Sequence, residues 1–158
     1  MSDAVAYFIT WTTYATWLPG DSRGWAKKKT WGIQPPDPLL EDTARVSLAE
    51  APVILSQEQR DLVDQVIVKH CQIRGWELHA RNVRTNHVHI VVTAPGVEPK
   101  IVREQIKAWC SRRLSEHAGL TGGGKNGQRR WWTERGDIEL IWNKEQLEAV
   151  IRYVLEMQ

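Results

Sequence analysis

The most regular alternation of polar and apolar residues in the chain spans residues 85–92. Valine and isoleucine occupy every second position from residue 88 to residue 92, and His87 and His89 alternate with them. Because successive side chains of a strand point to opposite faces, this pattern predicts a strand with its apolar side chains in a core and both imidazoles on the other face. The residues alone leave open whether the histidines bind one metal ion or form an exposed pair of no consequence.

Capping and breaking residues delimit three helices around this strand. A capping box at Ser56 opens a helix that Gly75 ends, Pro99 starts a second helix that stops at Gly119, and Asn143 caps a third. Aromatic and β-branched residues predict further strands at 4–14 and 77–83, and a hairpin or one broken strand at 131–132 and 137–142.

The order of these elements is strand, helix, strand, strand, helix, strand and a terminal helix. This order predicts an α+β fold, the ferredoxin-like β-α-β-β-α-β antiparallel sheet with an added C-terminal helix. Two helices should cover one face and leave the other free for the histidines. We expect a single domain over residues 1–158, with a long loop insertion at about 15–55, where proline and glycine leave few regular patterns.

The hairpin that contains the histidines has a preferred register. If Val83 pairs with His87 across a three-residue loop, Leu78, Ala80 and Asn82 share the apolar face. The side chains of His79 and Arg81 would then lie on the histidine face. We therefore expect Arg81 beside His89.

Helical periodicity assigns faces to the helices. Four groups follow from the sequence: a buried stripe in the first helix, an apolar stripe and a basic stripe in the second, and an apolar stripe in the third. These are Leu62, Val63, Val66, Ile67 and Ile73; Val102, Ile106, Trp109, Cys110 and Leu114; Lys100, Arg103 and Lys107; and Leu147, Val150, Ile151, Val154 and Leu155. Tyr153 lies roughly 120° from the middle of the last stripe, at its flank or on the surface.

Composition excludes several classes of protein. The chain is 42% hydrophobic and 25% charged, and it has neither an apolar run of about 18 residues nor the pattern of a signal peptide. Cys71 and Cys110 fall within predicted helices, which favours buried thiols in a cytosolic protein over a disulfide or a cysteine zinc site. The glycine-rich segment at 119–130 lacks the ending of a phosphate-binding P-loop, so no nucleotide cofactor is expected.

Positive charge is concentrated in one region. From Pro99 to Arg135 there are nine Lys and Arg residues against three Glu, although the whole chain has a net charge of only +2. A local excess of this kind is typical of a protein that binds a polyanion, although a solvated helix followed by a polar loop would give the same count. The nine tryptophans can fill a core or offer flat surfaces for base stacking.

Three segments together resemble the HUH single-tyrosine transposases, and among them the REP-associated tyrosine transposase-like group (the IS200-like transposase fold). They are the segment from Tyr7 to Tyr14 with Thr16-Trp-Leu-Pro-Gly-Asp-Ser-Arg-Gly-Trp25, the segment Val83-Arg-Thr-Asn-His-Val-His-Ile-Val-Val92, and Ala149-Val-Ile-Arg-Tyr-Val-Leu155. The resemblance spans most of the chain. The Asn-His-Val-His motif, followed by a helix with an off-core tyrosine, is its most specific part.

This resemblance implies a metal-dependent enzyme that cleaves and rejoins single-stranded DNA beside a hairpin. His87 and His89, with Gln158 as a candidate third ligand, would bind Mg²⁺ or Mn²⁺, and Tyr153 would be the nucleophile that forms a 5′-phosphotyrosine. The resemblance further implies a homodimer that binds DNA palindromes, which we expect in the cytoplasm and associated with the nucleoid. Candidate DNA-binding residues are Arg81, Lys100, Arg103, Lys107, Arg129, Arg130, Trp131 and Trp132.

Two other hypotheses fit parts of the sequence. The first is a domesticated, catalytically inactive protein that still binds DNA hairpins. The second is a zinc-dependent hydrolase that uses His79, His87 and His89. Chelation, metal content and replacement of Tyr153 distinguish these hypotheses from a transposase.

Overall fold

The computed structural model describes residues 4–16, 23, 25–26, 32–46, 52–119 and 130–156. Its elements are β1 (Ala6–Thr12), β2 (Trp25–Ala26), β3 (Ile33–Gln34), α1 (Pro38–Val46), α2 (Gln57–Arg74), β4 (Glu77–Val83), β5 (His87–Thr93), α3 (Pro99–His117), β6 (Asp137–Ile141) and α4 (Lys144–Glu156). The boundaries of α2, β4, β5 and α3 agree closely with the predicted elements.

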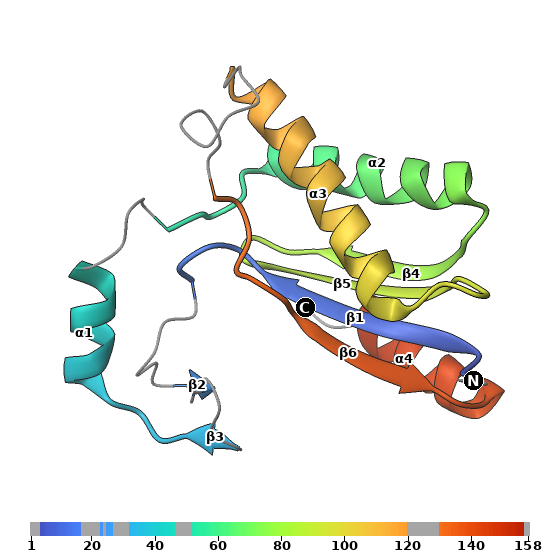
Figure 1. Ribbon diagram of the computed structural model, residues 1–158, viewed down its shortest axis with the longest axis horizontal. Helices are drawn as coiled ribbons and strands as arrows, with labels where there is room; N and C mark the ends of the chain where they lie inside the picture. Colours follow the sequence, from blue (N-terminus) through green and yellow to red (C-terminus); the bar gives the residue numbers. More distant parts are fainter. Residues whose placement is uncertain are drawn as a thin grey trace.

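A four-stranded antiparallel sheet forms the centre of the fold, with strand order β4-β5-β1-β6. Helices α2 and α3 lie side by side over one face of this sheet (Figure 1). The chain passes from β1 through α2 to β4, which is not its neighbour in the sheet, and β5 then pairs between β1 and β4. Helix α3 makes the second crossover, from β5 to β6 on the other side of β1. This arrangement confirms the predicted α+β, ferredoxin-like fold.

The opposite face of the sheet carries α4, which packs against β4 and β5 (Figure 1). Its apolar side contributes Val154 to a small buried cluster with Ala6, Ala80, Val91 and Ile141. The expectation of a free face was therefore wrong. The amphipathic terminal helix has to bury its apolar stripe, and this face of the sheet is where it does so.

The predicted hairpin register was also wrong near the turn. Val83 pairs with Val88 rather than with His87, and an irregularity between Leu78 and Ala80 restores the expected pairing of Leu78 at the far end. The turn between β4 and β5 is one residue longer than predicted. The β-bulge between Leu78 and Ala80 compensates for this extra residue, so that the predicted register returns beyond it. A shift of one residue exchanges the faces of a strand, and a bulge reverses the exchange beyond it.

Arg81 consequently lies on the α2 side of the sheet, opposite Ile90, and not on the histidine face. Its Nε donates a hydrogen bond of 2.7 Å to the Asp64 carboxylate. Asn82 takes the predicted place of Arg81 and pairs with His89. The predicted apolar face of β5 is confirmed, since Val88, Ile90 and Val92 all belong to the main core.

The segment before β6 is one broken strand, which decides between the two predicted alternatives. Trp132 forms an isolated bridge with Thr13, the residue that directly follows β1. Pairing with β1 resumes where Asp137 lies opposite Thr10. Arg103 and Lys107 hold the interruption in place. Arg103 donates to the Gly136 carbonyl at 2.9 Å, and Lys107 Nζ donates to the carbonyls of residues 133 and 135 at 2.9 and 2.6 Å.

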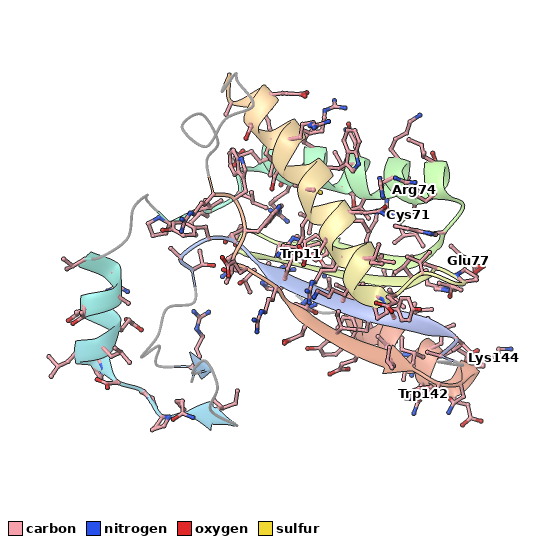
Figure 2. The ribbon with its side chains drawn as sticks, viewed as in Figure 1. Trp11, Cys71, Arg74, Glu77, Trp142 and Lys144 are labelled. Carbon is pink, nitrogen blue, oxygen red and sulfur yellow. The ribbon has the colours of Figure 1, made fainter. Side chains whose placement is uncertain are left out.

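The main core fills the space between the sheet and the two helices. Trp11 is 1% exposed, and Figure 2 labels it near the C-terminal end of β1, between the sheet and α3. Trp131 and Trp132 belong to the same core, and the Trp132 ring meets the Trp11 ring edge-on at 6.0 Å. Three members of the predicted apolar stripes are exposed instead of buried: Ile73 at 69%, Trp109 at 42% and Leu155 at 57%.

The predicted helix ends are confirmed. Ser56 and Gln59 form the capping box of α2, and Gly75 ends it in the left-handed region at φ 72°. Pro99 occupies the first turn of α3. The Asn143 side chain accepts a hydrogen bond from the Gln146 amide at 2.8 Å, at the turn between β6 and α4 where Figure 2 labels Trp142 and Lys144.

The insertion between β1 and α2 contains more regular structure than expected. Helix α1 and the two-residue strands β2 and β3 stand beside the main body (Figure 1). The start of α1 has a signal in the sequence. The Asp37 side chain accepts a hydrogen bond from the Leu40 amide, and Pro38 occupies the first helical position. None of the residues of α1 is buried.

Gly136 is a position where only glycine fits. Its φ is 140°, and a Cβ there would lie 2.5 Å from the Thr10 carbonyl oxygen and 3.1 Å from Cβ of Trp11. We expect Gly136→Ala to lower the free energy of unfolding by about 2–4 kcal/mol, measured by urea denaturation.

Gly96→Ala is the matched control for this substitution. Gly96 also has a positive φ, 74°, but a Cβ there would meet nothing within 4 Å. It should therefore cost only the backbone strain, about 1 kcal/mol. Equal losses for the two variants would contradict the close approach of Gly136 to β1.

Candidate functional site

Two histidines of β5 and one tyrosine of α4 form the candidate site. His87 and His89 project from the sheet face that α4 covers, at the end of β5 next to the Arg84–Asn86 turn. In β1, the neighbouring strand, Thr12 lies opposite His87 and Thr10 lies opposite His89. The alternation of β5 therefore places both imidazoles on one face, as predicted.

His89 is buried, with 6% of its surface exposed. Its Nδ1 lies 2.8 Å from Oγ1 of Thr10, within hydrogen-bond distance. Its Nε2 has no hydrogen-bond partner and is one of only two such buried side-chain nitrogens or oxygens in the described parts of the chain. A buried polar atom without a partner is costly, so this nitrogen is suited to a ligand.

His87 is half-buried and stands directly beside His89. The two ring centroids are 4.7 Å apart, with an angle of 76° between the ring planes. Nδ1 of His87 lies 2.7 Å from Oδ1 of Asn86, the residue that precedes it in the turn. Two imidazoles at this spacing can share one cation.

Burial and nearby positive charge keep both rings neutral. Burial, the neighbouring His87 and the Arg84 guanidinium together lower the pKa of His89 from 6.5 to about 4. The pKa of His87 is also lowered, by burial and by the charges of Arg84 and Arg23. Neutral imidazole is the form that binds metals, so both rings are in the ligand form at pH 7.

The lowered pKa of His89 has a consequence for stability. Because the pKa is about 4 in the folded protein and 6.5 when unfolded, the unfolded chain binds protons more readily between these values. Stability is complete above pH 6.5 and is lost as the pH falls toward 4. The expected loss is about 2 kcal/mol at pH 5 and about 3 kcal/mol at pH 4.

Urea denaturation at pH 7 and pH 5 measures this loss. His89→Leu, which removes the titrating ring, should show a smaller decrease than the natural sequence over the same interval. An equal decrease in both proteins would mean that other groups cause it.

Tyr153 lies on the outward flank of α4 and is 50% exposed. The centroid of its ring is 6.3 Å from that of His89, and Phe8 contacts both rings at 6.1 and 5.6 Å. Asn82 donates a hydrogen bond of 2.9 Å to the Val154 carbonyl in the last turn of α4. This bond links the last turn of α4, which carries Tyr153, to β4, in which Asn82 lies opposite His89.

His87 and His89 are the residues here that could hold a metal ion. Among the described residues, no group of three or more His, Cys, Asp and Glu side chains is placed to bind one. His79, a member of the zinc hypothesis, instead contacts Oγ1 of Thr93 at 2.7 Å and the Glu77 carboxylate at 3.4 Å. The three-histidine zinc site is therefore wrong, and Gln158 lies outside the described residues.

The candidate DNA-binding residues occupy different environments. Arg103 and Lys107 are each 6% exposed and bind backbone carbonyls, so they form no surface stripe with the exposed Lys100. Trp131 and Trp132 are core residues at 4% and 9% exposure, which leaves little ring surface for bases.

Two other candidates, Arg81 and Arg130, are exposed, and Arg129 lies outside the described residues. The Arg130 guanidinium stands 6.0 Å from the Tyr14 ring. Arg81 keeps its ion pair with Asp64, away from the histidines.

Sequence reasoning missed Thr10, Asn82 and Arg84 as parts of the site. Thr10 had a signal, because Thr10 and Thr12 alternate with the core residues Ile9 and Trp11 along β1. The sequence did not show that β1 would pair with β5 and place Thr10 opposite His89. Asn82 was assigned to the wrong face by the hairpin register.

A comparison with protein-family models gives a match to the IS200-like transposases over residues 49–156, more than half of the chain. The chain belongs to the IS200-like transposase family. The matched region contains both histidines and Tyr153. No curated protein matches the sequence.

Two solved structures share the fold of this chain. A REP-associated tyrosine transposase bound to a REP hairpin aligns with a TM-score of 0.54 and 16% identity, over 98% of this chain and 66% of that one. This IS200-like chain thus spans 66% of the length of that transposase. A protein from Deinococcus radiodurans R1 assigned as a transposase aligns with a TM-score of 0.54 and 17% identity, over 97% of this chain and 89% of the other.

A search of the described helices for a bilayer-spanning segment found none with enough length and hydrophobicity.

Proposed function

We propose that this transposase is a metal-dependent enzyme that cleaves and rejoins single-stranded DNA beside a hairpin through a 5′-phosphotyrosine. One observation carries the proposal: an exposed tyrosine on the terminal helix lies 6.3 Å, ring to ring, from a buried histidine of β5 that has an unpartnered Nε2. A tyrosine beside a histidine nitrogen that has no protein partner suits phosphoryl transfer, because one can supply the nucleophile and the other a metal ligand.

Tyr153 would act as the nucleophile. Its phenolic oxygen attacks the phosphorus of a phosphodiester, the bond to the 3′ oxygen breaks, and the products are a 5′-phosphotyrosyl ester and a free 3′-hydroxyl. The tyrosine proton is lost and the leaving 3′ oxygen gains one. Because one phosphodiester replaces another, the reverse attack by a 3′-hydroxyl rejoins DNA without an external energy source.

His87 and His89 would hold Mg²⁺ or Mn²⁺, which, when bound, would polarise the phosphate and stabilise charge on the leaving oxygen. The environment of the pair fits this role, because both rings are neutral and the Nε2 of His89 lacks any other partner. Gln158 remains the proposed third ligand.

Positive charge around the site would orient the DNA backbone. The charges of Arg84 and Arg23 lower the pKa of His87, and we include both residues as candidate DNA contacts for this reason. They join Lys100, Arg129 and Arg130 as the proposed phosphate contacts. Four of the original candidates are buried and would instead stabilise the fold: Arg103, Lys107, Trp131 and Trp132.

The proposed substrate is a single strand that carries a hairpin, acted on by a homodimer. The hairpin-bound REP-associated transposase, which shares the fold, supports this substrate class. The family match supports strand transfer as the reaction class.

The test uses purified protein and single-stranded oligonucleotides that carry a hairpin, incubated with Mn²⁺ or with a chelator. The expected result is a covalent protein–DNA adduct on denaturing gels with Mn²⁺ and none with the chelator. An unstructured strand of the same composition serves as the control substrate. Hairpin binding that persists in the chelator, without cleavage of any hairpin in Mn²⁺, would favour a domesticated DNA-binding protein instead.

A further inference from the structure

Each histidine of the candidate site has its Nδ1 held by a neighbouring side chain. We propose that Asn86 and Thr10 are positioning residues that keep both rings in the Nδ1–H tautomer, so that both Nε2 lone pairs can bind one cation. The proposal rests on the metal-dependent function proposed above and deepens it. Its basis is a pair of short contacts, 2.7 Å at His87 and 2.8 Å at His89.

The contact at His87 fixes the position of the proton. The Oδ1 of Asn86 is an amide oxygen and can only accept, so Nδ1 of His87 must donate. A neutral imidazole has one N–H, and Nε2 of His87 therefore has the free lone pair.

The position of Asn86 in the chain makes this contact possible. Within a strand, the preceding side chain would point to the opposite face. Asn86 lies in the turn just before β5 begins, where its side chain can reach the ring of its neighbour. This geometry explains why an asparagine directly before His87 can act on it.

The contact at His89 needs a second argument, because the Thr10 hydroxyl can donate or accept. If it donated, Nε2 of His89 would carry the proton, and this buried nitrogen has no acceptor. Orphaned buried N–H groups are rare in folded proteins. The alternative is that Nδ1–H donates to Thr10, which leaves on Nε2 the lone pair that a cation uses.

The pairing of β1 with β5 sets the position of Thr10. Thr10 lies opposite His89, and on its other side it pairs with Asp137 of β6. The close approach of Gly136 to the Thr10 carbonyl packs β6 against this part of β1. The hydroxyl is therefore held by the sheet itself rather than by a loop.

The experiment measures tautomers in the metal-free protein by ¹⁵N NMR of the histidine rings at pH 7.5, and Mn²⁺ affinity by calorimetry. The variants are Thr10→Val, Thr10→Ser and Asn86→Ala. Thr12→Val is the matched control, because Thr12 also lies on β1 but its hydroxyl is hydrogen-bonded to Thr133 rather than to a histidine ring.

In the natural sequence both rings should carry their proton on Nδ1. Thr10→Val should shift His89 toward the Nε2–H form and weaken Mn²⁺ binding about 10–100-fold, and Asn86→Ala should do the same at His87. Thr10→Ser should restore both readouts, and Thr12→Val should leave them unchanged.

A proton on Nε2 of either ring in the natural protein would overturn the proposal, as would undiminished Mn²⁺ affinity in both Thr10→Val and Asn86→Ala. These failures differ from a failure of the proposed function. With Nδ1–H tautomers and Mn²⁺ binding as expected, the absence of any covalent DNA adduct would overturn the enzyme and leave the positioning roles supported.

Discussion

Tyr153→Phe is expected to fold like the natural protein and to form no covalent adduct with hairpin DNA. The substitution removes one oxygen from a side chain that is 50% exposed, and it keeps the ring that packs edge-on against Phe8. Stability should therefore change by less than about 0.5 kcal/mol. Because the missing oxygen is the proposed nucleophile, cleavage should fall roughly 10³-fold or more.

Tyr14→Phe is the matched control for this prediction. Tyr14 packs against the main core and near Arg130, and no contact joins it to the histidines in the described structure. Its variant should retain the adduct. Adduct formation by Tyr153→Phe would remove Tyr153 from the mechanism, whereas loss of the adduct in Tyr14→Phe alone would point to the wrong tyrosine.

His89→Leu is expected to separate stability from activity. Leucine would fill a buried position and remove a nitrogen that has no partner, so the free energy of unfolding at pH 7 should stay within about 1 kcal/mol of the natural value. Loss of one of two imidazole ligands should lower Mn²⁺-dependent cleavage about 100-fold or more. Hairpin binding in the presence of a chelator should remain.

His79→Leu is the control for a histidine outside the site. His79 contacts Thr93 and Glu77 near the bulge of β4, so its variant should keep both Mn²⁺ affinity and cleavage. If His89→Leu cleaves DNA at the natural rate, the histidines have no catalytic metal to hold. If His79→Leu is inactive as well, the ligand set differs from the one proposed.

The fold could be predicted because its signals are local. Alternation in β5, the capping box at Ser56 and the left-handed Gly75 each depend on a few adjacent residues, and all three are confirmed. The helical period also placed Tyr153 correctly, away from the core. These features required no knowledge of which strands pair.

Errors arose where long-range pairing decides the outcome. The longer turn between β4 and β5, and the bulge between Leu78 and Ala80 that compensates for it, have no signature in the sequence. The one-residue shift between them moved Arg81 away from the histidines and Asn82 toward them. Arg103 and Lys107 have the spacing of an exposed basic stripe. Their hydrogen bonds to the carbonyls of residues 133–136 depend on a strand interruption that lies about thirty residues further along the chain.

Tryptophan content was ambiguous for a related reason. A tryptophan that fills a core and one that stacks on bases look the same in a sequence, because both interactions use the same large flat ring. Trp131 and Trp132 belong to the core, where their indole N–H groups donate to Ser115 and to the Lys107 carbonyl. Trp109, predicted to be buried, is instead exposed beside Arg112.

Peptide mapping of the protein–DNA adduct tests the central claim most directly. The protein is incubated with hairpin-bearing single-stranded DNA and Mn²⁺, digested with protease and nuclease, and sequenced by mass spectrometry. We expect a nucleotide linked through its 5′-phosphate to Tyr153 in the peptide of α4. A nucleotide on any other residue, or cleavage that leaves no covalently modified peptide, would contradict the account.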